Sequence, residues 1–232
     1  MSALAARLGS AARAALDFVL PQRCPDCGAG AEAARLLCDA CRSRIPRLAF
    51  AVCARCAARG LDPAGCRSHA GYRVWPAWIY DERAALVVHA LKYGERPTVA
   101  RALGGALAAA LPPGAAYDLV LEVPLHPARE RERGYNQAAL LADALAQTIG
   151  VPRLPRALER VRVTRPQARL GPRERRENLA GAFRVARPRW LEGRSVVIVD
   201  DVLTTGATLE ACLAVLADAG ARPVGVTLAW AQ

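Results

Sequence analysis

Two adjacent aspartates, Asp200 and Asp201, follow an apolar run and precede a loop of short side chains. Short side chains let the backbone N–H groups of a loop converge on one anion, and the N-terminus of a following helix favours the same charge. The two carboxylates repel a phosphate, but they accept hydrogen bonds from vicinal hydroxyls and suit Mg²⁺. The pattern therefore predicts a site for a ribose with a 5′-phosphate. The predicted ligand-binding residues after the aspartates are Leu203, Thr204, Thr205, Gly206, Ala207 and Thr208.

The aspartate pair also has three other interpretations. A buried strand that ends in a solvated acidic turn fits the apolar run and the two acids alone. A Walker B site requires a G-x-x-x-x-G-K-[ST] partner, which the sequence lacks. The acids of a receiver-type pocket belong near the start of a domain, and these lie near the end of the chain. The string VVIVDDVLTTGAT resembles the phosphoribosyl diphosphate (PRPP) motif of type I phosphoribosyltransferases.

A second polar loop follows a second apolar run at Leu119 to Val123. In an open α/β sheet, ligands bind beyond the carboxyl ends of the strands, so both loops are expected to face one crevice. Arginines and amides suit a pyrophosphate, although alternating Arg and Glu also fit the start of a salt-bridged helix. The predicted residues of this pyrophosphate loop are Pro124, His126, Arg129, Arg133, Gly134, Asn136 and Gln137.

A basic segment at residues 160–176 is interrupted by proline and glycine. Long loops in compact domains are lids, binding loops or disordered segments, so solvated disorder is the alternative here. We favour a mobile basic hood over the crevice, anchored by the following NLAGAF. Lys92, the only lysine, is predicted to be a solvated helix-end cation, with a contact to ligand phosphates as the alternative. The predicted hood residues are Arg165, Gln167, Arg173, Arg176 and Asn178.

Seven of the eight cysteines lie close together in the first third of the chain, mostly in C-x-x-C pairs. A two-residue spacer lets a turn aim both ligands at one metal ion, and two turns complete a tetrahedron. Two structural zinc sites are therefore predicted, rather than a disulfide framework. An interleaved, RING-like pairing of the same residues stays open, and the terminal histidine is the weakest ligand. Successive pairing gives Cys24, Cys27, Cys38 and Cys41 for one site and Cys53, Cys56, Cys66 and His69 for the other.

These groups require a sheet to position them. Val196 to Val199 lack polar alternation, which is typical of a central parallel strand covered by helices on both faces. A helix is predicted directly after the phosphate loop, from Ala207 to Ala219. Other predicted strands are Arg73 to Tyr80 at an edge, Leu119 to Val123, Arg153 to Leu158 and Arg222 to Trp230; other predicted helices are Glu82 to Leu91, Arg96 to Leu111 and Asn136 to Ile149.

The length of 232 residues allows one ordinary domain and a small appendage. The net charge of +11 favours anionic partners, phosphates or nucleic acid, without choosing between them. No apolar run approaches the ~18 residues that span a bilayer, and no secretory signal precedes the cysteines, so we expect a cytoplasmic protein without membrane insertion. The predicted organisation is an N-terminal helix at residues 1–20, a double zinc ribbon at 21–70 and an α/β domain at 71–232.

Taken in order, the cysteine pairs, LKYGE, VPLHPARERERGYNQ, RVRVTRPQARLGPRERRENLAGAF and VVIVDDVLTTGATL resemble the ComF family of competence-associated, phosphoribosyltransferase-like proteins. The resemblance implies a type I phosphoribosyltransferase fold with Asp200 and Asp201 on the ribose hydroxyls of PRPP, as catalytic residues, together with Mg²⁺. It implies either phosphoribosyl transfer to an unidentified acceptor or a non-catalytic accessory that binds single-stranded DNA and DNA-uptake proteins. His69 departs from the more usual cysteine, which puts only the second metal site in question.

Overall fold

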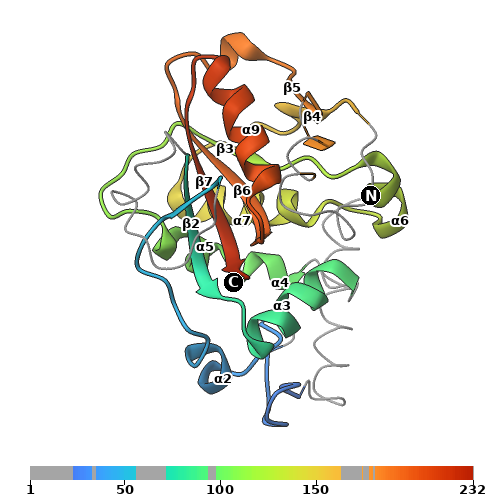
Figure 1. Ribbon diagram of the computed structural model, residues 1–232. Coiled ribbons are helices and arrows are strands. Elements are labelled where there is room, and N and C mark those ends of the chain that lie inside the picture. Colours follow the sequence, from blue (N-terminus) through green and yellow to red (C-terminus); the bar gives the residue numbers. More distant parts are fainter. Residues whose placement is uncertain are drawn as a thin grey trace, which may run out of the picture.

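The computed structural model describes residues 23–32, 35–55, 72–93, 98–162, 174, 178–179 and 181–231. The predicted helix at residues 1–20 lies outside the described residues. A five-stranded sheet forms the centre of the molecule, in the order β1-β2-β7-β6-β3 (Figure 1). Its strands are β1 (Val52–Cys53), β2 (Arg73–Ile79), β3 (Leu119–Glu122), β6 (Ser195–Leu203) and β7 (Arg222–Trp230).

Four of these strands are parallel, and β1 alone is antiparallel to its neighbour β2. The central strand β6 buries Val196 to Val199 completely, because helices cover both faces of the sheet. The predicted α/β class, with a mostly parallel sheet flanked by helices, is therefore confirmed. The predicted strands at 119–123 and 222–230 are also confirmed.

One face of the sheet packs against four helices and the other against a single helix and a hairpin. The first face carries α3 (Glu82–Tyr93), α4 (Thr98–Arg101), α5 (Gly104–Ala110) and α7 (Gln137–Ile149). The second face carries α9 (Ala207–Asp218) and the hairpin of β4 (Leu158–Arg160) and β5 (Phe183–Val185). Shorter elements are α2 (Asp39–Ser43), α6 (Pro127–Arg133) and the 3₁₀ turn η2 (Pro188–Trp190).

Four element predictions need correction. Strand β6 does not stop at the aspartates but runs to Leu203, since Asp200 and Val202 still pair with β7. Strand β2 is not a free edge, because β1 and Arg47 pair with it. No strand runs through 153–157: Arg153 makes one isolated bridge, and β4 begins at Leu158. The helix predicted over 96–111 is divided into α4 and α5, and α5 lies so close to α7 that a Cβ at Gly104 would collide with a backbone carbonyl.

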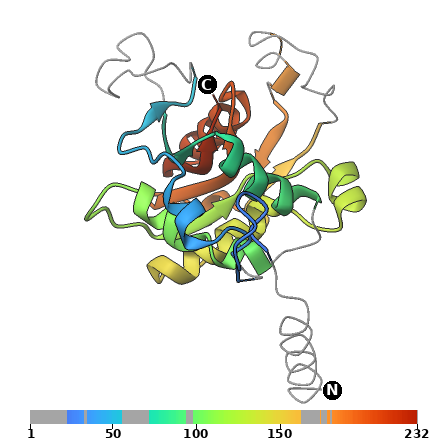
Figure 2. The same ribbon diagram turned by 90° about the horizontal axis from the view of Figure 1, so that it is seen from below.

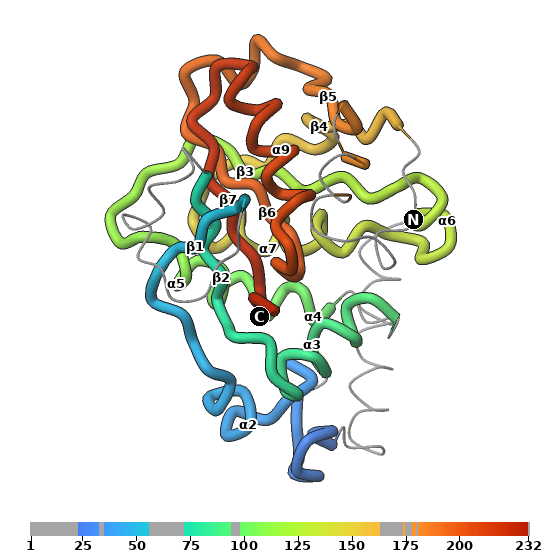
Figure 3. The backbone as a smooth tube through the Cα atoms, in the orientation of Figure 1, coloured from blue at the N-terminus to red at the C-terminus, as the bar shows by residue number. Residues whose placement is uncertain are grey.

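The cysteine segment lies beyond the carboxyl ends of the strands, on the side of the sheet that carries α3 (Figures 1 and 2). The segment that follows α2 runs alongside β2 and leads into β1 (Figure 3). Trp78 and Cys212 are buried in the core. Within the part of the chain that the structure describes, no helix has the length and apolarity to cross a membrane.

Candidate functional site

The two aspartates occupy the carboxyl end of β6, and their side chains point to opposite faces of the sheet because strand residues alternate. Asp201 is 5% exposed and faces α3 and α7. Asp200 faces α9, where it interacts with Cys212. The Asp200 carboxylate accepts a hydrogen bond from the backbone N–H of Asp201 at 2.8 Å, and the Asp201 carboxylate accepts one from the N–H of Val202 at 2.7 Å. These bonds fix both carboxylates at the strand end.

Asp201 is held by two side chains from the neighbouring helices. The Nζ of Lys92, in the last turn of α3, lies 3.0 Å from Asp201 Oδ2, and Gln137 Nε2 donates to the same oxygen at 3.3 Å. Arg133 Nη1 donates to Gln137 Oε1 at 2.6 Å and so extends the network into the second loop. The prediction of a solvated helix-end lysine is therefore wrong, because the fold places the end of α3 over the end of β6. Contact of Lys92 with a ligand phosphate stays a prediction.

The environment of the aspartate pair perturbs two ionisable groups. Burial, and next the charge of Asp201, raise the pKa of Asp200 to about 8. The pKa of Lys92 is also raised: burial lowers it, but the charge and hydrogen bond of Asp201 outweigh the burial. Without a ligand, one carboxylate is therefore protonated and the other is neutralised by an ammonium group. A divalent cation would favour the charged form of Asp200.

The loop after the aspartates turns directly into a helix. Gly206 has φ +76° and is the N-cap of α9, which begins at Ala207. A left-handed φ is costly for any residue with a Cβ, so glycine is required here. The predicted phosphate residues, with Asp200, line a hollow of about 30 Å³. The structure thus brings the residues from 203 to 208 together around one spot, beside Asp200.

This loop has a neighbour that sequence reasoning did not find. A Cβ on Gly206 would collide with the backbone carbonyl oxygen of Ala54, which follows Cys53 and is fully buried. The next residue, Arg55, places its Nε 3.5 Å from Glu210 Oε1 in the first turn of α9. Residues 54 and 55, which follow Cys53, therefore pack against the loop that follows the aspartates and the first turn of α9. No local sequence pattern relates residues more than 150 positions apart, so only the fold reveals this contact.

The second loop divides into residues that shape the backbone and residues that reach the aspartates. His126 Nδ1 accepts a hydrogen bond from Ala128 N at 3.2 Å and caps α6, while Gly134 ends α6 with φ +80°. Asn136 Oδ1 caps α7 by accepting from Ala138 N at 3.0 Å. Of the predicted set, Gln137 contacts Asp201 directly and Arg133 does so through Gln137. Pro124 is partly buried on the same loop.

A cavity of about 250 Å³ adjoins this network. Three cationic side chains line it, from Lys92, Arg129 and Arg133, together with Tyr93, Glu132 and Tyr135. The Tyr135 hydroxyl donates to the Leu91 carbonyl at 2.6 Å, which ties the second loop to α3. The Arg133 guanidinium lies 5.3 Å from the centre of the Tyr93 ring. Three cations against one carboxylate make this cavity suitable for a polyanion.

Of the predicted hood, only Asn178 lies within the described residues. It is partly buried, and its carbonyl accepts a hydrogen bond from Arg162 Nη2 at 2.7 Å. The neighbouring Leu179 and Phe183 are buried against the core, which confirms that NLAGAF is anchored. The other hood residues, Arg165, Gln167, Arg173 and Arg176, lie outside the described residues.

The first four cysteines gather into one cluster. The sulfur atoms of Cys24, Cys27, Cys38 and Cys41 all lie within 4.8 Å of one another. The distance from Cys27 Sγ to Cys38 Sγ is 3.6 Å, close to the ~3.8 Å that a tetrahedral Zn²⁺ with Zn–S of ~2.3 Å requires. The donor set therefore fits zinc, with successive rather than interleaved pairing in this cluster.

The thiolate is the ligand form of cysteine, and two thiols of the cluster differ in how readily they adopt it. Burial opposes the charged form of Cys24, but hydrogen bonds from the backbone of Cys38, Cys27 and Asp26 lower its pKa to about 6. Hydrogen bonds to Asp26 and Cys27, together with burial, raise the pKa of Cys41. Of the second predicted set, Cys53 is buried in β1. The remaining predicted ligands, Cys56, Cys66 and His69, lie outside the described residues.

Comparison with known proteins gives two family matches. Residues 15–70 match the double zinc ribbon domain, and residues 135–232 match the phosphoribosyl transferase domain. A DNA utilization protein, YhgH, from Escherichia coli O157:H7 is 32% identical over 214 residues, which cover 88% of this chain and 81% of that protein. Competence protein F from Haemophilus influenzae is 37% identical over 110 residues, 47% of this chain and 48% of that protein.

Two further matches are more limited in extent. The YhgH protein of Salmonella typhi is 36% identical over 156 residues, 63% of this chain, and the match spans 66% of that protein. Among solved structures, an allosteric regulatory enzyme of purine biosynthesis aligns with a TM-score of 0.41 and 23% identity, over 60% of this chain and 29% of that one.

Proposed function

Since this chain belongs to the ComF family and joins a double zinc ribbon to a phosphoribosyl transferase domain, we propose that it binds PRPP with Mg²⁺ and transfers the phosphoribosyl group to an acceptor. The acceptor stays unassigned, since no described cavity selects one nucleophile. We place this activity in the cytoplasm. The ribbon binds zinc through the four-cysteine cluster, and a second zinc ion at the later cysteines is part of the proposal.

One observation carries the proposal: two carboxylates, a small hollow lined by the loop at 204–208 and a cationic cavity lie at the carboxyl ends of β3 and β6. A ribose 5-phosphate with a pyrophosphate on C1 carries the complementary groups in the same order. Its vicinal hydroxyls would lie at Asp200 and Asp201, its 5′-phosphate in the loop at 204–208, and its pyrophosphate near Arg129 and Arg133.

In the proposed reaction the bond from C1 of the ribose to the pyrophosphate oxygen breaks, and the oxygen keeps the electron pair. A lone pair of the acceptor forms the new bond to C1, and the acceptor loses its proton to solvent. Carboxylates at the ribose hydroxyls favour the positive charge that develops on the ring, and arginines stabilise the departing pyrophosphate. Mg²⁺, when bound, would neutralise further charge on that leaving group.

Lys92 would have two positions in this scheme. In the chain without ligand it neutralises Asp201 at 3.0 Å. Its ammonium group also lines the cationic cavity, so that it can turn to the pyrophosphate when ribose hydroxyls or the cation take its place on Asp201. Asp201 would thus have a partner both with and without PRPP, so the empty site does not leave a buried carboxylate unpaired.

Calorimetric titration with PRPP in the presence and absence of Mg²⁺ tests the proposal. We expect Mg²⁺-dependent binding by the wild type and at least about tenfold weaker binding by Asp201→Asn, because charged hydrogen bonds are lost. Asp218→Asn is the matched control, since Asp218 ends α9 far from its N-terminus. Equal affinity of Asp201→Asn and Asp218→Asn would overturn the assignment of the site.

The raised pKa of Asp200 gives a second test. The folded chain keeps this proton up to about pH 8, whereas the unfolded chain loses it near pH 4. Raising the pH between these values therefore lowers the free energy of unfolding. It should tighten Mg²⁺–PRPP binding, because the cation requires the charged form. Both slopes should flatten in Asp200→Asn, and binding that weakens towards pH 8 would contradict this role.

Pyrophosphate release with candidate acceptors tests transfer itself. The wild type should release pyrophosphate with at least one nucleobase, with ammonia or with a nucleic acid, and Asp201→Asn should not. A wild type that binds PRPP and releases none with any of these would leave binding without transfer as the function.

A second candidate function is a non-catalytic accessory that binds single-stranded DNA and DNA-uptake proteins. It is favoured by the net charge of +11 and by the names of the relatives, DNA utilization protein and Competence protein F. Salt-dependent DNA binding that survives Asp200→Asn and Asp201→Asn would support it. No affinity for single-stranded DNA at low salt would exclude it.

A further inference from the structure

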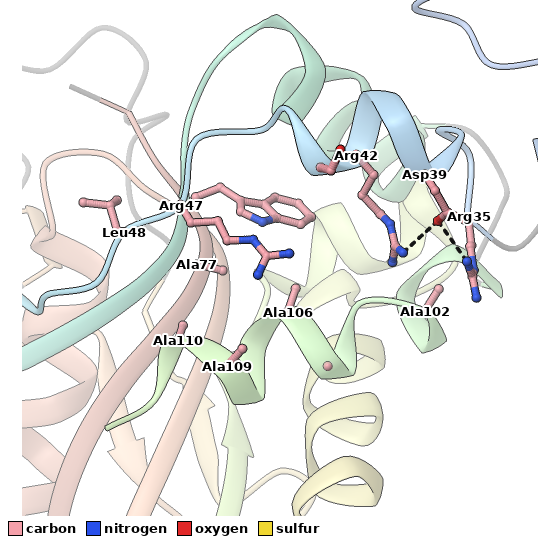
Figure 4. A pocket seen from close by; sticks show the side chains of 13 residues that line it. Arg35, Asp39, Arg42, Arg47, Leu48, Ala77, Ala102, Ala106, Ala109 and Ala110 are labelled. Carbon is pink, nitrogen blue, oxygen red and sulfur yellow. Dashed lines mark hydrogen bonds and ion pairs between the residues drawn. The ribbon is translucent and has the colours of Figure 1, made fainter. Parts of the chain in front are cut away.

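A further cavity lies apart from the aspartates, where residues 35–48 of the cysteine segment meet β2 and α5 (Figure 4). Its volume is about 440 Å³, within the ~300–1,000 Å³ range of small-molecule sites. It shares no lining residue with the cavities beside Lys92 and the phosphate loop. Arginines from the cysteine segment form one side, and the outer face of α5 forms the other.

The charges of this cavity favour an anion. Three guanidinium groups line it, from Arg35, Arg42 and Arg47, against the single carboxylate of Asp39. Asp39 Oδ1 accepts from Arg35 Nη1 at 3.0 Å and from Arg42 Nη2 at 2.9 Å, so it orients two arginines. Glu32 also pairs with Arg35, with its Oε2 3.1 Å from Arg35 Nε, so the two carboxylates leave one net positive charge on the three guanidinium groups. Arg47 makes no ion pair with any residue that the structure describes, and its side chain extends towards α5 (Figure 4).

A buried donor also opens onto the cavity. Trp78 is only 4% exposed and lines this space. Among the described residues its indole N–H has no hydrogen-bond partner, and its nitrogen is not sealed in the core. Because this nitrogen reaches the cavity, water can accept its hydrogen bond in the free chain, and an acceptor on a ligand can take the place of that water. The backbone bridge between Arg47 and Trp78 holds the free guanidinium and the indole side by side.

The opposite wall is flat. The face of α5 that lines the cavity, together with Ala102 two residues before the helix, carries only small side chains at positions three and four apart. No side chain on this wall extends beyond a Cβ, so a planar ring can lie against it. An inorganic anion would occupy only the arginine side and leave this wall uncovered. The wall consists of Ala102, Gly105, Ala106, Ala109 and Ala110.

We propose that this cavity binds a nucleotide, with the phosphate on Arg42 and Arg47 and the base along the alanine wall of α5. The indole N–H of Trp78 donates to an acceptor on the sugar or the base. The nucleotide is either a free mononucleotide or one nucleotide of a single strand, since both present the same phosphate, sugar and ring. The site is independent of the proposed phosphoribosyl transfer, and with a strand as ligand it would locate the DNA binding of the second candidate function.

The test compares two charge-matched variants of the full chain. Fluorescence anisotropy with a labelled 15-nucleotide oligo(dT) measures strand binding, and calorimetry with AMP and dTMP measures binding of the free nucleotides. Arg47→Gln should weaken the binding of the preferred probe by about tenfold, the cost of one charge-assisted hydrogen bond. Arg189→Gln, which removes an exposed arginine of η2, should change it less than about twofold.

A third variant addresses shape rather than charge. Ala106→Gln places a longer side chain on the flat wall without lowering helix propensity, and it should also weaken the preferred probe. Displacement of oligo(dT) by AMP or dTMP identifies a mononucleotide site, whereas binding of the strand alone identifies a single-strand site. Affinities of Arg47→Gln and Ala106→Gln equal to that of Arg189→Gln would overturn the proposal. Mg²⁺–PRPP titration of the same variants should match the wild type, which separates this result from failure of the proposed transfer.

Discussion

The two cysteine regions use the same C-x-x-C spacing but attach to the α/β domain in different ways. The four-cysteine cluster lies beyond the strand ends and is tied to α3 by an ion pair between Asp26 and Arg83 at 2.8 Å. The region of Cys53 is part of the central sheet through β1, and the carbonyl of the next residue, Ala54, lies against Gly206 in the loop after the aspartates. The first region is therefore attached to α3 and lines neither cavity of the candidate site, whereas the second contacts the loop beside Asp200.

This difference shows that the C-x-x-C spacing does not determine which part of the protein a segment packs against. A C-x-x-C turn fixes the direction of two thiolates over a few residues, and the rest of its surface is available for packing. In the first region that surface contacts α3. In the second region it contacts the backbone at Gly206, in the loop after the aspartates. Disturbing the two regions should therefore have separable effects on stability and on PRPP binding.

The largest expected effect is loss of the first cluster. Cys41→Ser removes a ligand, and the chain should lose one bound zinc ion and a large part of the stability of its first region, because structural zinc binding is worth ~10–16 kcal/mol in isolated fingers. Zinc content and chemical denaturation measure both. Cys212→Ala, which removes a core thiol far from the cluster, should keep its zinc.

At a temperature where Cys41→Ser is folded, its affinity for PRPP should stay near that of the wild type. Loss of PRPP binding would mean that the first region shapes the site too.

The next largest effect is expected where the second region contacts the loop, at Ala54 and Gly206. Gly206→Ala should lower the free energy of unfolding by about 2–4 kcal/mol, through the left-handed φ and the collision with the Ala54 carbonyl, and it should abolish PRPP binding. Gly114→Ala is the matched control, since Gly114 has φ +74° and open space around it. It should cost only about 1 kcal/mol. Equal losses in the two variants would show that Ala54 does not constrain the loop.

The smallest expected effect comes from breaking the ion pair of each region, Arg55–Glu210 in the second and Asp26–Arg83 in the first. Arg55→Gln breaks the half-exposed pair with Glu210 and should cost less than about 1 kcal/mol, with a two- to threefold loss of PRPP affinity through α9. Arg83→Gln breaks the corresponding pair of the first cluster and should leave PRPP affinity unchanged. The reverse order in a calorimetric titration would contradict the comparison.

Local sequence patterns predicted several elements accurately because each depends on a few adjacent residues. The run from Val196 to Val199, the capping residues Asn136 and Gly150 around α7, and the C-x-x-C spacings carry their structure in their own order. The patterns were weaker where packing overrides propensity. Arg153 lies beside β3 without forming a strand, and the helix predicted over 96–111 is divided so that α5 can pack closely on α7.

The order of residues alone determined the α/β class, the aspartate pair with its small-residue loop, and the four thiols of the first cluster, because each depends on spacing over a short stretch of chain. Only the tertiary structure decided that Lys92 neutralises Asp201, that Ala54 touches Gly206 and that three arginines face an alanine wall. These contacts join residues far apart in the chain. Their distances depend on how helices and strands pack, and packing is a property of the whole fold.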